Sequence, residues 1–354
     1  MLRAVELAKK GIGFVNPNPL VGTVIVKDGR IIGEGWHEKY GELHAERNAL
    51  KNCTENPEGA DMYVTLEPCC HYGKNPPCTE AVIEAGIKRV YTGSFDPNPL
   101  VAGKGLEILR NSGIEVIAGF EEDACDALNE IFFHYITTKT PYVILKTAVT
   151  ADGKTASVTG NSKWITNEKS RANAHETRKR VSAIMAGIGT VLADNPMLNC
   201  RVEKPSNPVR IIADSSLRIP VESNIIKTAH EIPTYIASLS EDYEKMRILE
   251  DKGAKVIHAE NHGGKIDLRA LMKTIGHMGL DSVLIEGGAK LHTSALKCGI
   301  VNKLQIYTAP KIMGGDGKNA FESLGITTAD GALRLKNPKV THFDDDILTE
   351  YEVV

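Results

Sequence analysis

The sequence lacks any long apolar run and any large excess of charge of one sign. No stretch approaches the roughly 18 apolar residues that cross a bilayer, so we expect no membrane-spanning helix. The formal net charge of −3 gives no overall basic field for nucleic acid or an anionic membrane, and we expect neither as a partner. A local basic pocket for a phosphorylated small molecule is compatible with these numbers.

A secretion signal and a disulfide pattern are also missing. The first residues, MLRAVELAKKG, are charged and helical in pattern, unlike the apolar core of a signal peptide. Seven cysteines, an odd number, argue against a disulfide framework. We therefore expect a reducing, cytoplasmic location in which some of the cysteines serve metal binding or catalysis.

The length favours two domains, because 354 residues exceed what one hydrophobic core usually serves. A helical pattern that begins near Asp123 frays into Thr-Thr-Lys-Thr before Pro141, which disfavours helix in the residue before it. A buried strand, PYVILKTAV, follows directly. We place the boundary near residue 140, which gives domains of residues 1–139 and 140–354.

Both halves alternate helices and strands. In the first, the pattern predicts a hairpin over residues 20–36 that turns at Lys27–Gly29. It also predicts helices at 2–11, 45–53, 78–86 and 103–113, and strands at 61–68, 87–94 and 114–119. This order is typical of a mixed sheet covered by helices on both faces. The second half contains short Val/Ile-rich runs that indicate another α/β unit, at residues 181–193, 209–215, 234–238, 254–259, 281–288 and 303–310.

His44-Ala45-Glu46 begins one of the predicted helices. Residues two apart do not share a helical face, which suits a pair in which His44 holds a metal and Glu46 stays free beside it. A lone H-x-E is weak evidence. Here Pro68-Cys69 follows at the end of a strand, and Cys78 opens the next helix. Together they approach the H-x-E…P-C-x-x-C signature of zinc nucleobase deaminases.

The arrangement favours a catalytic metal. A helix N-terminus and a cation both lower the pKa of a thiol, and three protein ligands leave the fourth tetrahedral position open for water. The cysteine spacing is C-x8-C instead of C-x-x-C.

The first half resembles a specific family. VNPNPLVG, GWHEKYGELHAE, YVTLEPCCHYGKNPPC and SFDPNPLVAGKG are similar to the deaminase half of the bifunctional riboflavin-biosynthesis deaminase/reductases, whose pattern TLEPC-x-H-x-G-x-x-P-P-C this chain fills. The resemblance implies a cytidine-deaminase-like three-layer domain with zinc held by His44, Cys69 and Cys78. It leaves Cys70 non-ligating, because relatives often carry serine there, and it makes Glu46 the catalytic proton carrier.

The resemblance also implies how this half binds a phosphoribosyl-aminopyrimidine. His71 and Lys74 are expected near the ribose phosphate, Asn18 and His37 near the pyrimidine, and Asp96 and Asn98 near the ribose. Asn75 stands where relatives more often have threonine.

The second half has no G-x-G-x-x-G fingerprint, so a standard dinucleotide fold is not indicated. Instead GIGT at 187–190 and EGGAKLHTS at 286–294 each follow a Val/Ile-rich strand. Their glycines stand where backbone N–H groups can face an anion.

LKTAVTADGKTA, SKWIT, AHETRKRVSAIMAGIGTVLADNPMLNCR, IIADSSLRIP and LIEGGAKL resemble the reductase half of the same family. The resemblance implies a dihydrofolate-reductase-like α/β domain that uses NADPH. Expected cofactor-binding residues are Ala148, Trp164, Thr190, Asp194, Ser216, Gly288, Ala289, Lys290, Leu291, His292, Thr293 and Ser294. Expected substrate-binding residues are Ser162, Arg178, Leu198, Arg201 and Glu286.

Residue chemistry is compatible with these roles. Arg178 and Arg201 are of the type that clamps a phosphate with bidentate hydrogen bonds. Hydride transfer needs mainly orientation of the nicotinamide against the ribose carbon. The ring oxygen of the opening ribose must gain a proton, and the sequence leaves Lys146 and Asp194 as alternative donors.

The hypothesis is thus a zinc-dependent deamination of 2,5-diamino-6-(5-phosphoribosylamino)pyrimidin-4-one, followed by NADPH reduction of the ribose to a ribityl chain, in a homo-oligomer. One alternative is a tRNA or nucleoside deaminase with an unrelated or inactive second domain, which the C-x8-C spacing and the acidic net charge oppose. Another is a structural zinc module, which would require a fourth protein ligand.

Overall fold

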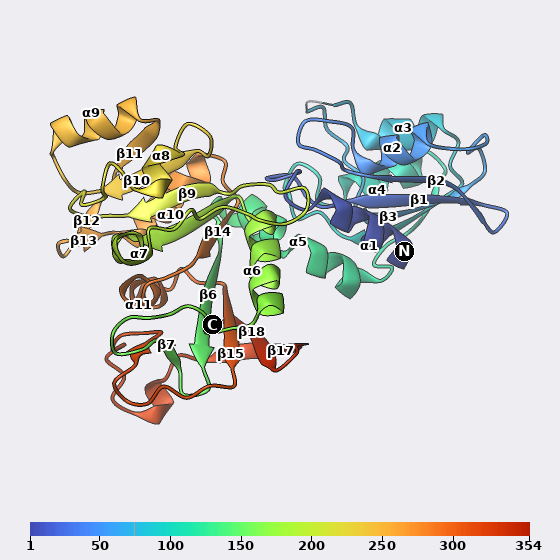
Figure 1. The fold of residues 1–354 in the computed structure, drawn as a ribbon. Helices are drawn as coiled ribbons and strands as arrows, with labels where there is room; N and C mark the ends of the chain where they lie inside the picture. The colour runs from blue at the N-terminus through green and yellow to red at the C-terminus, as the bar shows by residue number, and fades with distance from the viewer. Residues whose placement is uncertain (74) are drawn as a thin grey trace. The chain divides into compact units, whose positions relative to one another are not determined.

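The computed structural model describes residues 1–73 and 75–354. The chain divides into two compact units, Met1–Lys139 (unit 1) and Thr140–Val354 (unit 2), each with its own sheet (Figure 1). Within the described residues, none of the helices combines the length and the apolar character that a membrane crossing requires.

Unit 1 is built on a five-stranded sheet in the order β2-β1-β3-β4-β5. β1 is antiparallel to β2 and β3, and β3, β4 and β5 are parallel. The predicted hairpin is confirmed: Lys27 pairs with Arg30, and Asp28 and Gly29 between them both have positive φ, as tight hairpin turns require. The strands are β1 (Gly22–Lys27), β2 (Arg30–Trp36), β3 (Asp61–Leu66), β4 (Arg89–Ser94) and β5 (Glu115–Ile117).

Helices cover both faces of this sheet, as predicted. α1 and α5 pack together on one face, and α2, α3 and α4 lie on the other (Figure 1). Close approach explains two glycines: a Cβ on Gly22 would lie 2.0 Å from Ala4 O in α1, and one on Gly35 would lie 2.3 Å from Ala49 N in α2. The helices are α1 (Leu2–Ala8) with the 3-10 turn Lys9–Gly11, α2 (Ala45–Lys51), α3 (Cys78–Glu84), α4 (Lys104–Asn111) and α5 (Glu122–Thr138).

Unit 2 contains a nine-stranded sheet in the order β11-β10-β9-β8-β14-β6-β15-β18-β17. The strands from β11 to β15 in this order are parallel, and the β17–β18 hairpin adds antiparallel to β15. The main strands are β6 (Tyr142–Thr150), β8 (Ala183–Gly187), β9 (Val209–Ala213), β10 (Thr234–Ser238), β11 (Ala254–His258), β14 (Ser282–Ile285), β15 (Lys303–Ala309), β17 (Leu335–Phe343) and β18 (Asp346–Val353). Short pairs are β7 (Lys154–Ala156) with β16 (Lys318–Asn319), and β12 (Asn261–His262) with β13 (Lys265–Ile266).

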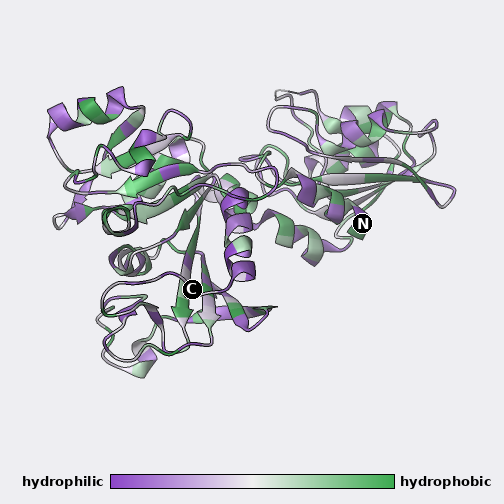
Figure 2. Ribbon diagram, viewed as in Figure 1, coloured by the Kyte–Doolittle hydropathy of each residue, from purple (hydrophilic) through white to green (hydrophobic). Residues whose placement is uncertain are grey.

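The central strands of unit 2 are buried on both faces. Along β8, Ala183 and Met185 face α10 and α11, whereas Ile184 and Ala186 face α7, α8 and α9. Apolar residues follow the strands accordingly, and polar residues cover α6 and α9 (Figure 2). The helices are α6 (Glu168–Arg180), α7 (Ile188–Asp194), α8 (Asn224–Lys227), α9 (Tyr243–Asp251), α10 (Leu268–His277) and α11 (Ala289–Lys297), with a 3-10 turn at Ala329–Gly331.

For unit 2 the sequence patterns predicted strands but no helix bounds, and among the strands of the nine-stranded sheet they missed the β17–β18 hairpin. β17 is an edge strand whose residues are nearly all exposed, so it has no apolar alternation to recognise. Its register shifts between Lys336 and Lys339, around Pro338, which an edge strand tolerates because the missing N–H faces solvent.

Candidate active sites

Three metal-binding side chains meet above the sheet of unit 1. His44 is the N-cap residue of α2, Cys69 follows β3, and Cys78 is the first residue of α3. His44 Nδ1 lies 3.5 Å from Cys69 Sγ and 3.4 Å from Cys78 Sγ. All three donor atoms lie within 4.8 Å of one another. The two helix N-termini and the strand end therefore bring together groups up to 34 residues apart.

The cluster fits zinc. With Zn–N near 2.05 Å and Zn–S near 2.3 Å, tetrahedral geometry separates nitrogen and sulfur by about 3.6 Å, close to the 3.4 and 3.5 Å found here. One imidazole and two thiols form the donor set of a borderline-soft cation. In the described part of the chain, no fourth His, Cys, Asp or Glu belongs to this group. The donor set is thus that of an open, catalytic site.

The two sulfurs of the cluster have opposite pKa shifts. The backbone N–H of Cys78, at the start of α3, donates to Cys69 Sγ at 3.4 Å. A hydrogen bond from the Cys78 thiol, helped by His44, lowers the pKa of Cys69 to about 4, and the same bond together with burial raises the pKa of Cys78. A divalent cation at the centre of the cluster would displace the proton of the Cys78 thiol.

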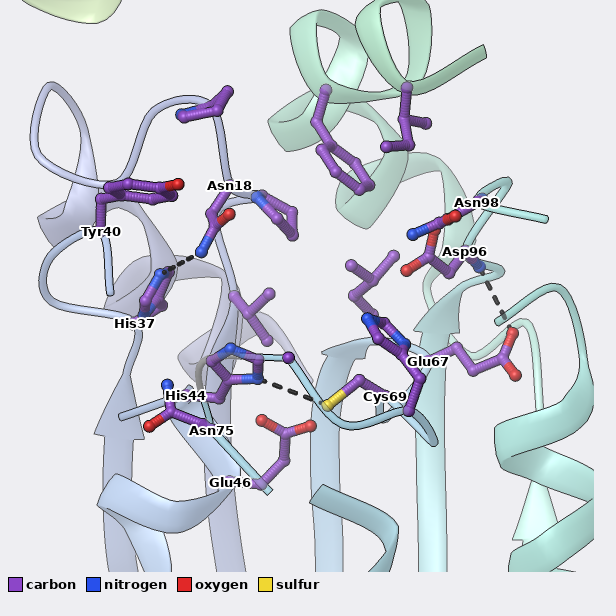
Figure 3. A pocket seen from close by; sticks show the side chains of 18 of the residues that line it. Asn18, His37, Tyr40, His44, Glu46, Glu67, Cys69, Asn75, Asp96 and Asn98 are labelled. Atoms are coloured by element: carbon purple, nitrogen blue, oxygen red, sulfur yellow. Dashed lines mark hydrogen bonds between the residues drawn. The ribbon is translucent and has the colours of Figure 1, made fainter. Parts of the chain in front are cut away.

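Glu46 lies beside the cluster without belonging to it. Its carboxylate points toward the space between His44 and Cys69 (Figure 3), and the residue is 3% exposed. Burial, and then the negative charge of Cys69, raise its pKa above the ordinary value. A buried, unligated carboxyl group at this position is suited to carry protons.

His44, Cys69 and Glu46 line a cavity of about 310 Å³. Asn18 and His37 lie on one wall, where Asn18 Nδ2 is 3.1 Å from His37 Nε2 (Figure 3). His37 Nδ1 lies 3.1 Å from Leu43 O, so that nitrogen carries the hydrogen and Nε2 accepts from the Asn18 amide. Burial lowers the pKa of His37, in keeping with a neutral ring. The Asn18 carbonyl oxygen is left as an acceptor for a ligand.

Asp96 and Asn98 lie on the opposite wall of the cavity. Asp96 Oδ1 accepts the Asn98 N–H at 2.8 Å, and burial raises the pKa of Asp96 to about 6. Both residues are positioned through Glu67, which sequence reasoning missed. The Glu67 carboxylate accepts N–H groups of Gly103 and Gly105 at 3.0 Å each, at the start of α4, and that of Asp96 at 3.4 Å.

The other residues that were predicted for this site, or that lie next to it in the sequence, have the following positions. His71 lines the cavity, and its buried Nδ1 has no hydrogen-bond partner among the described residues. Asn75 lines it too and donates from Nδ2 to Glu42 O at 2.9 Å. Cys70 directs its sulfur to Leu100 O at 3.8 Å, outside the cluster. The prediction for Lys74 lies outside the described residues.

An apolar wall of the cavity was also not predicted. Phe132, Tyr135 and Ile136 of α5 line it, opposite the cluster-bearing loops. Their i, i+3 and i+4 spacing places them on one helical face. The spacing alone signals a buried face, and only the packing of α5 on the sheet shows that this face borders a ligand cavity.

In unit 2 the predicted residues gather at the carboxyl ends of the parallel strands, where open α/β sheets bind ligands. Glu286, just after β14, pairs with Arg178 of α6 through Nε–Oε1 at 2.7 Å and Nη2–Oε2 at 2.9 Å. Arg178 Nη1 donates to Asn199 O at 2.8 Å. These contacts differ from the expected phosphate clamp, because Glu286 occupies the bidentate edge of the Arg178 guanidinium.

Lys146 of β6 lies in the same charge cluster. Its Nζ is 5.4 Å from the centre of the Tyr307 ring. Burial lowers the pKa of Lys146, and the nearby Glu286 opposes this shift. Asp194, the alternative proton donor, is exposed at the last residue of α7. The two candidate proton donors therefore differ in environment: Lys146 lies near Glu286, whereas Asp194 is exposed.

Arg201, the second predicted phosphate ligand, is hydrogen-bonded to His175 of α6. Its Nε donates to His175 Nε2 at 3.2 Å. Burial, followed by the positive charges of Arg178 and Arg201, lowers the pKa of His175 to about 4. The His175 ring is therefore a neutral acceptor that orients Arg201, which remains exposed.

The segment that carries Ser162 and Trp164 is held from two sides. Lys311, just after β15, donates to Trp164 O at 2.8 Å and to Ile165 O at 2.7 Å. The Arg171 guanidinium lies 4.5 Å from the centre of the Trp164 ring. Trp164 is 60% exposed, so its ring is available to a ligand.

The two glycine motifs meet each other. Gly187 N–H, at the end of β8, donates to Gly287 O at 3.1 Å. A Cβ on Gly287 would lie 3.3 Å from Thr190 Oγ1. Gly288 is the N-cap residue of α11 and has no side chain, so no N-cap side chain accepts one of the first N–H groups of that helix.

Other predicted cofactor and substrate residues differ in exposure. Ala148 of β6 pairs with Tyr307 of β15, and Ser216 is exposed just after β9. Leu198 is buried with φ +48°. Within α11, Leu291, His292 and Thr293 are buried, whereas Lys290 is exposed.

The buried Glu286 predicts an acid-sensitive stability. Burial acts to raise its pKa, but the positive charges of Arg178 and Lys146 lower it to about 2. Because the folded pKa lies below the unfolded value, this carboxylate stabilises the fold above about pH 4.5 and loses its contribution as the pH falls toward 2. We expect a loss of ~3 kcal/mol over that window, measured by calorimetry of the full chain.

The control for this prediction is the exposed Glu244 of α9. E286Q should flatten the acid dependence of the unfolding free energy, while E244Q should leave the dependence as in the unaltered chain. Equal slopes for the unaltered chain and E286Q would contradict the assignment of the low pKa to Glu286.

The fold and the sites define a class. An open His/Cys/Cys metal cluster beside a buried carboxyl group is the site of a zinc-dependent nucleobase deaminase, and it is joined to an α/β unit with glycine loops at its strand ends. Residues 1–94 match the cytidine and deoxycytidylate deaminase zinc-binding region, and residues 141–349 match the RibD C-terminal domain.

Full-length relatives agree. The riboflavin biosynthesis protein RibD of Actinobacillus pleuropneumoniae is 51% identical, over 100% of this chain and 94% of the relative. Acinetobacter baumannii RibD superposes with a TM-score of 0.90 at 38% identity, covering 100% and 97% of the two chains. The diaminohydroxyphosphoribosylaminopyrimidine deaminase/5-amino-6-(5-phosphoribosylamino)uracil reductase of Thermotoga maritima has a TM-score of 0.90 at 40% identity, with the same coverage.

The chain belongs to the RibD family, the bifunctional deaminase/reductases of riboflavin biosynthesis. Members combine a zinc-binding deaminase domain with an NADPH-dependent, dihydrofolate-reductase-like domain and act on a phosphorylated aminopyrimidine. The family assignment confirms the predicted fold class and activity.

Proposed function

We propose that this chain deaminates 2,5-diamino-6-(5-phosphoribosylamino)pyrimidin-4-one in unit 1 and reduces the ribose of the product in unit 2. The observation that carries the proposal is the His44, Cys69 and Cys78 cluster with the unligated Glu46 beside it, at a cavity that His44, Cys69 and Glu46 line. Relatives whose names state both activities, similar over their full length, support the same pairing.

His44, Cys69 and Cys78 would hold the zinc ion of the deaminase site. When bound, zinc supplies a Lewis acid that brings the pKa of a water molecule toward about 7. Glu46 takes one proton of the attacking water and delivers it to the pyrimidine ring nitrogen. It then takes the remaining proton of the hydroxyl group added to the ring carbon and passes it to the amino group, which leaves as ammonia. The raised pKa of the buried Glu46 suits both directions of transfer.

The walls of the cavity would select the substrate. The Asn18 carbonyl oxygen, fixed by the hydrogen bond to His37, accepts an N–H of the pyrimidine. The α5 wall of Phe132, Tyr135 and Ile136 covers the ring's apolar faces and excludes water. His71, whose Nδ1 has no partner in the part of the chain that the structure describes, faces the ribose phosphate, and Asp96 with Asn98 faces the ribose hydroxyl groups.

In unit 2, Glu286 would orient the ribose while Arg178 keeps its carboxylate ionised. Of the two candidate proton donors, Lys146 is favoured because it lies in the Glu286 charge cluster, whereas Asp194 is exposed at the end of α7. A lysine with a lowered pKa can release its proton to the ring oxygen as the ribose opens. Arg201, held by His175, is the cation left for the phosphate.

One experiment tests both halves. The purified chain loaded with zinc is given the diaminopyrimidine substrate and NADPH, and ammonia release and NADPH oxidation are followed together. We expect ammonia first and NADPH consumption after it, in equal amounts. Ammonia release without NADPH oxidation would contradict the reductase proposal, and release from cytidine or tRNA but not from this substrate would contradict the deaminase proposal.

The expected homo-oligomer and cytoplasmic location stay predictions. Light scattering on the purified chain measures the first, and fractionation of the source cells measures the second.

A further inference from the structure

The ring of His292 is enclosed in unit 2 and bonded at both nitrogens. The residue is 3% exposed. Its Nε2 lies 2.7 Å from Gly287 N, and its Nδ1 lies 3.2 Å from Ala320 O. A backbone N–H can only donate and a carbonyl can only accept, so Nε2 is the acceptor and Nδ1 carries the hydrogen. Burial lowers the pKa of His292 to about 4, which keeps the ring neutral and its Nε2 lone pair free.

These contacts resemble a capping box displaced by one residue. Gly288 is the N-cap of α11, and His292 lies four residues into the helix. Its ring reaches back to the N–H of Gly287, the residue before the cap, much as a glutamate at the third helical position reaches back to the N-cap N–H. Without His292, the Gly287 N–H would lose this acceptor at a part-buried position.

This bond decides which way the glycine loop faces. Gly287 has φ +85°, and its carbonyl oxygen accepts the Gly187 N–H at 3.1 Å. With the Gly287 N–H turned inward to His292, the following N–H groups at the start of α11 keep no side-chain cap and lie beside Thr190. Uncapped N–H groups at a helix start are suited to bind a phosphate.

We infer that His292 is a positioning residue for the dinucleotide, holding the Gly287–Gly288 loop in the conformation that binds the cofactor phosphates through the α11 N-terminus. The inference rests on the proposed reductase function. It changes the role predicted for His292 from the sequence, because His292 now acts through the loop and its ring does not contact the cofactor. The link to Ala320 is a separate contact that supports the fold of α11.

Two near-isosteric variants separate the two contacts. In His292→Gln, the side-chain oxygen can replace Nε2 as the acceptor for Gly287, and the donor to Ala320 is lost. In His292→Asn, the amide nitrogen can replace Nδ1 as the donor to Ala320, and the acceptor for Gly287 is lost. We expect the Kd for NADPH to rise about tenfold in H292N and to stay within about twofold in H292Q, measured by titration calorimetry on the full chain.

Deamination, whose proposed residues all lie in unit 1, should keep its wild-type rate in both variants, and thermal unfolding of the full chain reports whether unit 2 of each variant is folded. The inference is overturned if H292N and H292Q bind NADPH equally, whether both at the wild-type Kd or both more weakly. Failure of the underlying function gives a different result: the unaltered chain would then neither bind nor oxidise NADPH.

Discussion

Glu46→Gln should reduce deamination by at least about a thousandfold while zinc stays bound. The glutamine side chain is nearly isosteric, so the His44, Cys69 and Cys78 cluster is left intact, but an amide cannot accept the proton of the attacking water and return it. Because Glu46 is buried, no bulk water is positioned to replace it. The measurement is ammonia release from the diaminopyrimidine substrate, together with the zinc content of the same sample.

The controls for this variant lie in both units. NADPH oxidation with the already deaminated substrate should be unchanged, because its proposed residues all belong to unit 2. Glu42→Gln is a matched surface change near the same loop, at an exposed residue, and should leave deamination at the wild-type rate. Loss of zinc from E46Q would instead show that Glu46 is a ligand, which would contradict the open site.

Much of the fold could be predicted because buried strands and helices place apolar residues at regular spacings in the sequence. β8 and β14 are buried runs of mostly apolar residues, and each lies within a stretch predicted from its Val/Ile content. The exposed edge strand β17 lacks such a pattern. Helix α5 contains a second feature that the sequence did not predict. Asn129 has non-helical dihedral angles, and its side chain is hydrogen-bonded to both the N–H and the C=O of Leu20, 109 residues away. Sequence periodicity carries no sign of such a pairing.

The candidate sites also differ in how much of each could be predicted from the sequence. The residues of the metal cluster were recognisable because short motifs and helix starts fix their local geometry, and the structure brings them together. In unit 2 the decisive contact joins Arg178 and Glu286, 108 residues apart, so the sequence could predict each residue type but not that they would bond to each other. His292 was predicted to be a cofactor-binding residue from the family resemblance alone. In the structure it lies within α11 and is 3% exposed.

Replacing Cys78 by serine should remove zinc from the purified protein and abolish deamination with it. Cys78 is fully buried at the first position of α3, and its sulfur lies 3.4 Å from His44 Nδ1. A serine hydroxyl is a poor ligand at neutral pH, since it does not readily become an alkoxide, and two remaining donors hold a borderline-soft cation weakly. We expect zinc affinity to fall by more than about a hundredfold, measured by metal analysis after dialysis against a mild chelator.

The neighbouring Cys70 provides the matched control. Cys70→Ser makes the same chemical change one residue from Cys69, but the Cys70 sulfur contacts Leu100 O at 3.8 Å and lies outside the donor group. That variant should retain one zinc per chain and near-normal deamination. Zinc lost from C70S and retained by C78S would exchange the roles of the two cysteines. If both variants retained zinc, His44 and Cys69 would hold the ion together with a ligand other than Cys70 or Cys78. The geometry of the cluster opposes that outcome.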